Sequence, residues 1–118
     1  MANTFKVVTN DAMPASAGTP LALYTAPGST TTVVLGLMLC NINTTAVTAS
    51  VKLTSSTSGG NPNANSDIFV VKNVNIPAGS SLEVLSGSKL ILQTTDDILI
   101  DCSVTAKIDA ALSIMEIT

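Results

Sequence analysis

The stretch VVLGLMLCNIN, at residues 33–43, contains no charged residue and constrains the fold more strongly than any other segment of the chain. Successive side chains of a β-strand point to opposite faces, so a strand with one solvent-exposed face alternates between apolar and polar residues. Here both faces are apolar, with Leu35, Leu37 and Leu39 on one and Val34, Met38, Cys40 and Ile42 on the other. We expect the leucine face to fill a core. We expect the second face to be covered, at least in part, by another sheet or another subunit.

The remaining sequence also favours strands. It is rich in Thr, Val, Ile and Ser, turn signals recur at short intervals, and no window has convincing helical periodicity. This pattern predicts an all-β fold, an antiparallel β-sandwich of jelly-roll-like form. Residues 1–19 are expected to form an N-terminal arm and connector, and residues 20–118 a single β-sandwich domain. Strands are predicted at residues 5–9, 21–25, 33–40, 47–55, 68–76, 81–86, 89–93, 98–106 and 110–118.

Two short segments with Pro and Gly predict turns. In APGS, Pro27 presets φ for position i+1, and Gly28 can adopt the positive φ that position i+2 of a type II turn requires. The segment PAGS, at residues 77–80, indicates that the same turn chemistry is used twice. A duplicated half-sandwich is the alternative, but the flanking residues do not repeat well enough to favour it. Residues 55–67 predict an exposed loop.

One segment of this loop places side-chain oxygens at alternate positions, as a calcium-binding loop does: Asn61, Asn63, Asn65 and Asp67. Ser66 stands where such a loop has Gly, and Lys72 stands where it has the bidentate Glu. The segment is therefore interpreted as an ordinary surface loop, and no metal or cofactor is expected.

The charge of the chain limits the classes of partner. Only 11% of its residues are charged, against roughly 25% in a typical soluble domain. The net charge is −3, and the five positive residues are lysines without a basic run, so nucleic acid is not an expected partner. The sequence has no apolar run near the roughly 20 residues of a membrane helix, and no secretory signal is visible. We expect synthesis in a cytoplasm and no membrane partner.

The sequence offers no catalytic constellation. It contains no His, so Ser–His–Asp and Cys–His arrangements are excluded. Cys40 and Cys102 have no cationic sequence neighbour that would lower a thiol pKa, and both are expected to be free thiols in the core. Asp96 and Asp97 are interpreted as turn residues rather than an acid–base pair. We expect no catalytic residue and a chain that is not an enzyme.

A carbohydrate-binding or adhesin-type β-sandwich module is the alternative function. Sugar sites commonly use exposed aromatic side chains, and Phe5, Tyr24 and Phe69 are the aromatic residues of the chain. The small number argues against this function. Tyr24 has an apolar body and a polar tip, which suit the rim of a core or an interface.

From residue 22 onward, the chain resembles small bacteriophage virion proteins of the capsid decoration or tail-associated β-sandwich type. The resemblance rests on the segments LYTAPGSTTTVVLGLMLCN, VTASVKL, IPAGSSLEVLSGSKLIL and LSIMEIT. It covers most of the chain, but its motifs are turns and strands rather than an active site. Thr95, Asp96 and Asp97 stand where similar proteins often have a Gly–Asp turn.

The resemblance implies a non-enzymatic virion structural subunit, either a capsid decoration or cement protein or a tail, neck or fibre-attachment protein. Its expected partners are copies of itself and other virion proteins, and its expected location is the virion after synthesis in the host cytoplasm. The candidate subunit-interface residues are Phe5, Val7, Val34 and Met38. We further expect residues 1–10 to pair with a sheet edge by strand addition, with a neighbouring subunit as the candidate for that edge.

Overall fold

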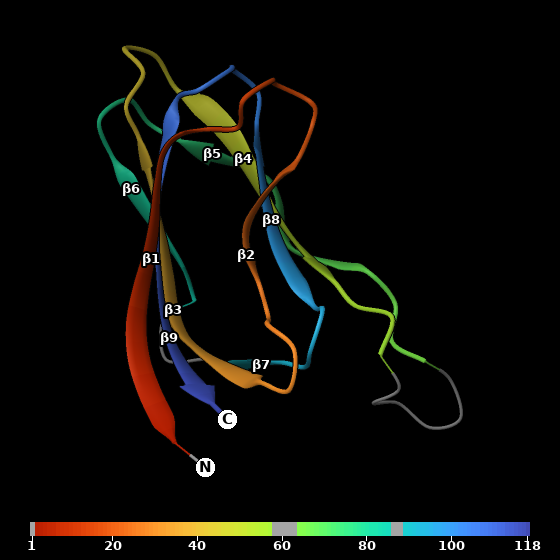
Figure 1. The fold of residues 1–118 in the computed structure, drawn as a ribbon. Helices are drawn as coiled ribbons and strands as arrows, with labels where there is room; N and C mark the ends of the chain where they lie inside the picture. The colour runs from red at the N-terminus through yellow and green to blue at the C-terminus, as the bar shows by residue number, and fades with distance from the viewer. Residues whose placement is uncertain (1, 58–63, 86–88) are drawn as a thin grey trace.

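The computed structural model describes residues 2–57, 64–85 and 89–118 of the chain. These residues contain strands and no helix, which confirms the predicted all-β class (Figure 1). Each predicted strand overlaps an observed one. The strands are β1 (Asn3–Met13), β2 (Leu21–Thr25), β3 (Thr31–Asn41), β4 (Val47–Thr54), β5 (Ile68–Ile76), β6 (Ser81–Leu85), β7 (Leu90–Leu92), β8 (Asp97–Cys102) and β9 (Ile108–Ile117). No helix in the described residues is long and apolar enough to span a membrane.

The strands form two antiparallel sheets. Sheet I has the order β1-β9-β3-β6, and β7 also pairs with β3; sheet II has the order β2-β8-β4-β5. The pairs are nested in the chain: β1 with β9, β2 with β8, β3 with β6 and β7, and β4 with β5. Successive pairs alternate between the sheets. This nesting is the connectivity of a jelly roll, so the predicted fold is confirmed.

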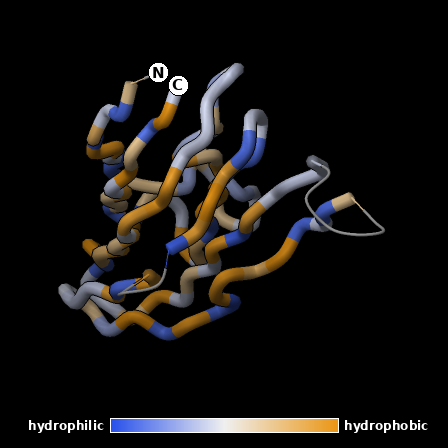
Figure 2. Tube along the Cα trace, turned by 90° about the horizontal axis from the view of Figure 1, so that it is seen from below, coloured by the Kyte–Doolittle hydropathy of each residue, from blue (hydrophilic) through white to orange (hydrophobic). Residues whose placement is uncertain are grey.

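The core lies between the sheets. In β4, Val47, Ala49 and Val51 are buried as the alternating sequence predicts, and Leu53 is half-buried. Figure 2 shows apolar and polar residues along the strands and the two termini side by side. Ala2 and Thr118 exchange two backbone hydrogen bonds there, of 3.0 and 3.2 Å, so the ends of β1 and β9 are held together.

Strand β3 departs from strict alternation at Leu35. Its pairing with β9 shifts register between Val34 and Gly36, so Leu35 is an inserted residue. An inserted residue moves the side chains that follow it to the other face. Val34 is therefore fully buried on one side of the bulge, and Leu37 and Leu39 are buried on the other. The prediction was correct for Leu37 and Leu39, but Leu35 is only half-buried and Val34 belongs to the core.

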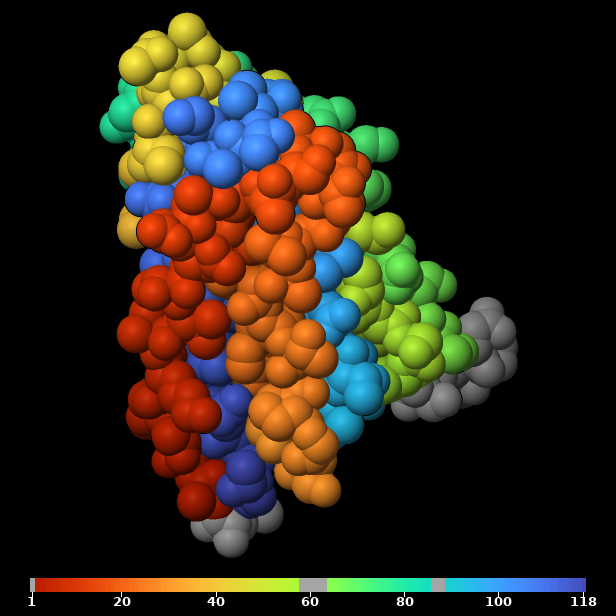
Figure 3. Space-filling model, turned by 45° about the horizontal axis from the view of Figure 1, so that its top comes forward, coloured from red at the N-terminus to blue at the C-terminus, as the bar shows by residue number. Residues whose placement is uncertain are grey.

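The segment expected to be an arm forms the edge of sheet I. Strand β1 pairs with β9 of its own chain from Asn3 to Met13, and the side chain of Met13 is fully buried in the core. Figure 3 shows β1 along one margin of the molecule, with β2 of sheet II beside it. Whether the other edge of β1 also pairs with a neighbouring subunit stays a prediction.

The two Pro-containing turns have positive φ at the second residue after the proline. Gly79 has φ of +69° and follows Pro77 by two residues. In the first turn this position is Ser29, with φ of +55°, and Gly28 has no positive φ. The expected assignment of Gly28 to the left-handed position is therefore wrong by one residue.

The loop predicted at residues 55–67 is partly described. Residues 61–63, which include two of the calcium-like oxygens, lie outside the described part. Asp67 Oδ1 accepts a hydrogen bond from the Ser55 amide at 3.0 Å, and Asn65 Nδ2 donates to Ser55 Oγ at 3.2 Å. These two side chains therefore bridge the ends of the loop.

Candidate assembly surface on sheet I

A row of apolar side chains crosses the outer face of sheet I. Phe5 of β1 pairs with Met115 of β9, Met115 pairs with Val33 of β3, and Val33 pairs with Ile91 of β7. The side chain of the adjacent Ile114 is fully buried, so the row points away from the core. Phe5 is 72% exposed and Ile91 is 56% exposed. The half-buried Val33 and Met115 connect these two exposed side chains, so the row forms a contiguous patch rather than scattered residues.

The patch continues toward the middle of the sheet. Val7 and Met38 are exposed, and Leu35 and Ala111 are partly exposed. Gly36 and Ser113 pair with each other between the Val33–Met115 pair and the Met38–Ala111 pair, and both are uncharged. We call the following residues the outer apolar face: Phe5, Val7, Val33, Leu35, Met38, Ile91, Ala111 and Met115.

Charged residues border this face at its margins. Glu83 pairs with Met38 at the β6 edge, and Lys89 immediately precedes β7. Asp11 and Asp109 lie near the far ends of β1 and β9. An apolar centre with a polar rim is the usual arrangement of a protein–protein interface.

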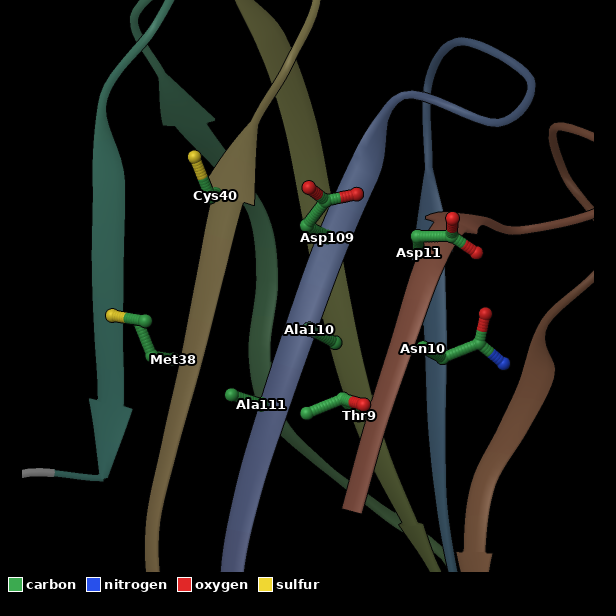
Figure 4. A pocket seen from close by; sticks show the side chains of 8 residues that line it. All are labelled: Thr9, Asn10, Asp11, Met38, Cys40, Asp109, Ala110 and Ala111. Carbon is green, nitrogen blue, oxygen red and sulfur yellow. The ribbon is translucent and has the colours of Figure 1, made fainter. Parts of the chain in front are cut away.

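A shallow hollow of about 640 Å³ opens on the same side of sheet I (Figure 4). Ala111 lies in it between Met38 of β3 and Thr9 of β1, because both pair with it. Asp109 lines the other end, and its Oδ1 accepts a hydrogen bond from the Ala12 amide at 3.1 Å. The small side chain of Ala111 leaves room for a side chain of a partner.

The sequence-predicted interface residues divide between the two sides of the sheet. Phe5, Val7 and Met38 lie on the outer apolar face, whereas Val34 is in the core and is not available to another subunit. That the other three contact a partner stays a prediction. Ile91 and Met115 were missed. The final strand, like β3, has apolar residues on both faces, and this signal could have identified Met115.

A hydrogen-bonded cluster joins the two sheets beside β1. Tyr24 of β2 donates from its hydroxyl to Glu116 Oε2 of β9 at 2.6 Å. Thr32 of β3 is 2.8 Å from the same phenolic oxygen and can donate to it. Lys6 Nζ lies 2.8 Å from Glu116 Oε1. The prediction that Tyr24 suits the rim of a core is consistent with this position.

The cluster changes the acidity of its members. Burial, together with the hydrogen bond to Glu116, raises the pKa of Tyr24 to about 12, so the phenol keeps its proton near neutral pH. Hydrogen bonds from Lys6 and Tyr24 lower the pKa of Glu116 below its usual value. A protonated phenol and an ionised carboxylate are the states that the hydrogen bond from Tyr24 to Glu116 needs. The cluster therefore acts as a clamp that holds the two sheets together.

The two cysteines are free, as expected, but they differ in burial. Cys102 of β8 is buried, whereas Cys40 of β3 is only partly buried and lines the hollow on sheet I. The expectation that both lie in the core is therefore wrong for Cys40. The bulge at Leu35 explains the difference, because it moves Cys40 away from the side of the buried Val34 to the outward face that it shares with Met38.

Of the two acidic residues after β7, Asp96 serves the local turn as expected, whereas Asp97 lies in a strand. Asp96 is buried, and its Oδ2 accepts a hydrogen bond from the Gln93 amide at 3.0 Å. Its Oδ1 accepts one from Thr57 Oγ1 at 3.3 Å. Asp97 begins β8. Across the described residues, no group of three or more His, Cys, Asp or Glu side chains is placed to hold a metal ion.

Comparisons with known proteins do not assign the chain to a family. The chain matches no protein-family model. No curated protein matches it significantly. A chain in a solved structure of Bacillus endospore appendages, described as a novel family of disulfide-linked pili, aligns with 99% of this chain and 87% of its own length. The aligned sequences are 15% identical and the TM-score is 0.49, so neither pilus formation nor disulfide linkage is transferred to this chain.

Proposed function

We propose that this protein is a non-enzymatic structural subunit that assembles with copies of itself through the outer apolar face. The observation behind the proposal is the aligned row of Phe5, Met115, Val33 and Ile91, which covers four strands of sheet I with uncharged side chains. Removing such surface from water is favourable, by about 25 cal/mol per Å².

The size of the face suits a stable contact. Strands β1, β3 and β9 contain ten or eleven residues each. At about 3.4 Å per residue and about 4.8 Å between strands, the four-strand face projects to roughly 35 by 15 Å. Its accessible surface exceeds this projection because the side chains make it rough. Stable interfaces bury about 800 Å² per partner, so a stable contact would use the whole face together with its polar rim.

A second copy is the partner best suited to this face. Each chain has a net charge of −3, so association through a charged face would bring like charges together. The centre of the outer apolar face carries no charge, so association through it brings no like charges together. Two such faces can stack as sheets about 10 Å apart, in a symmetric contact in which both copies use the same residues.

The finer assignment is a bacteriophage virion subunit, either on the capsid or in the tail, neck or fibre attachment. It rests on the resemblance of residues 22–118 to small virion proteins of that type. In that setting the other partners are virion proteins, and the chain is made in the host cytoplasm and resides in the particle. Mass spectrometry of purified particles tests this assignment, because copy number distinguishes a shell protein from a tail protein.

Charge substitutions test the assembly surface. Phe5→Lys and Ile91→Lys each place a charge in the apolar row, and both positions are exposed, so folding should persist. Ala22→Lys, at an exposed position on β2 of sheet II, adds the same charge away from the row and serves as the control. Light scattering after size exclusion should show smaller particles for the two row variants and no change for the control. Equal masses for all three variants and the wild type would reject the surface.

A further inference from the structure

Two lysines approach the ring of Phe69 on the outer face of sheet II. The Nζ of Lys72 is 4.9 Å from the centroid of the Phe69 ring, and the Nζ of Lys52 is 5.7 Å from it. Both distances are within the range of cation–π attraction. Two of the five lysines of an acidic chain thus meet at one of its three aromatic residues. The ring is 47% exposed, so it is available to a ligand.

A β-bulge produces this arrangement. Lys52 pairs with Phe69 and the adjacent Val51 pairs with Val71, so Val70 is an extra residue on β5. Val51 points into the core, and its partner Val71 shares that side. Lys72 therefore faces outward like Phe69, although an odd separation normally puts two residues on opposite faces. Simple alternation places the side chains of Phe69 and Lys72 on opposite faces, so this cluster could not be predicted from the strand pattern.

The three side chains border a hollow of about 190 Å³ with chemically distinct sides. Pro20 and Leu99 supply apolar walls, and Ser50, Asn73 and Asp101 supply polar groups. Asp101 is held in place, because its Oδ1 accepts hydrogen bonds from the amides of Gly18 at 3.0 Å and Cys102 at 2.8 Å.

The hollow holds charges of both signs. Among the described residues, the ion pair is Lys6 with Glu116, so neither Lys52 nor Lys72 is in direct contact with a described carboxylate. Lys52 of β4 and Lys72 of β5 supply cationic groups, and Asp101 of β8 supplies an acceptor for hydroxyl donors. A ligand suited to these groups has a carboxylate, several hydroxyls and a compact apolar face.

We propose that this hollow binds a saccharide unit that carries a carboxylate, of the uronic acid type. The ligand carboxylate accepts charge-assisted hydrogen bonds from Lys52 and Lys72. The hydroxyls at the opposite end of the sugar donate to Asp101, and the sugar ring packs against Phe69 and Leu99. A simple inorganic anion matches the lysines but not the acceptor or the apolar walls.

The position of the hollow is compatible with assembly. The two sheets enclose the core, so the outer face of sheet II lies on the opposite side of the sandwich from the outer apolar face. Stacking through sheet I leaves the hollow facing solvent. The binding proposal does not depend on the assembly proposal, because the hollow is complete within one chain.

Saturation-transfer difference NMR tests the site and tolerates large assemblies. The probes are D-glucuronate and D-galacturonate, with D-glucose, D-galactose and acetate as matched ligands that lack the charge or the sugar ring. We expect saturable binding of a uronate, with the neutral sugars and acetate at least about tenfold weaker. Glucose binding as tightly as glucuronate, acetate binding as tightly as either uronate, or no uronate binding at all would overturn the proposal.

Variants locate the binding. The double variant Lys52→Gln, Lys72→Gln should weaken uronate binding at least about tenfold, and Phe69→Ala should also weaken it. Lys89→Gln removes an exposed lysine outside the hollow and should leave the affinity unchanged. The double variant should keep the wild-type oligomeric mass, which separates this site from the assembly surface. Unchanged uronate affinity in the double variant would reject the hollow as the site.

Discussion

The phenolic oxygen of Tyr24 lies 2.6 Å from Oε2 of Glu116, and this contact fastens β2 of sheet II to β9 of sheet I. Hydrogen bonds to charged groups contribute about 1.5–3 kcal/mol. We therefore expect Tyr24→Phe to lower the free energy of unfolding by about 1–3 kcal/mol in urea denaturation. The double variant Tyr24→Phe, Glu116→Gln should be less destabilised than the sum of the single variants, and strict additivity would contradict a direct interaction. Lys6→Met should lower the free energy of unfolding by only about 0–1 kcal/mol, because the side chain of Lys6 is half-exposed.

The lowered pKa of Glu116 predicts a pH dependence of stability. Its usual pKa is 4.5, and the hydrogen bonds from Lys6 and Tyr24 lower the folded-state value. A depressed pKa in the folded state stabilises the fold above the unfolded-state pKa, and this contribution is lost as pH falls through the lowered value. The difference in unfolding free energy between the wild type and Glu116→Gln should therefore be larger at pH 7 than at pH 3. A difference independent of pH would contradict the ionised clamp.

Adjacent residues of β3 should respond in opposite ways to truncation. Leu39 is fully buried, so Leu39→Ala should cost about 2–5 kcal/mol of unfolding free energy. Met38 is 42% exposed, so Met38→Ala should change the stability of the monomer by at most about 0.5 kcal/mol. Chemical denaturation at low protein concentration measures both values. A large loss for Met38→Ala in the monomer would place that side chain in the core and remove it from the outer apolar face.

Glycine should be favoured at the positive-φ position of both turns. Ser29 has φ of +55° and is exposed, so Ser29→Gly should relieve strain and stabilise the fold by up to about 1 kcal/mol. Gly79 has φ of +69°, and an added Cβ there meets no atom within 4 Å. Gly79→Ala should therefore cost about 1–2 kcal/mol through backbone strain alone. Thermal unfolding compares the variants, and a stabilising Gly79→Ala would contradict the assigned conformation.

Sequence alternation predicted the sheets wherever the strands are regular. Val47, Ala49 and Val51 were placed correctly because every second side chain of β4 is buried throughout this segment. The same reasoning failed for Val34 and Leu35, because an inserted residue in β3 reverses the faces.

The site on sheet II escaped prediction for the same physical reason. Phe69 and Lys72 share a face only because β5 contains a bulge at Val70. A bulge is set by packing and pairing between strands, so the period of a single strand does not locate it. The outer apolar face was partly visible, because Phe5, Val7 and Met38 stand out in the sequence, whereas Ile91 joins them only through the pairing of β7 with β3.

Sedimentation equilibrium of the wild-type protein over a range from micromolar to millimolar concentration tests the central claim most directly. If the outer apolar face is an assembly surface, the mean mass should rise with concentration to a defined oligomer or to larger assemblies. The Phe5→Lys, Ile91→Lys double variant should stay a monomer over the same range. A wild type that remains a strict, soluble monomer at the highest concentration would contradict the claim that this protein is a self-assembling structural subunit.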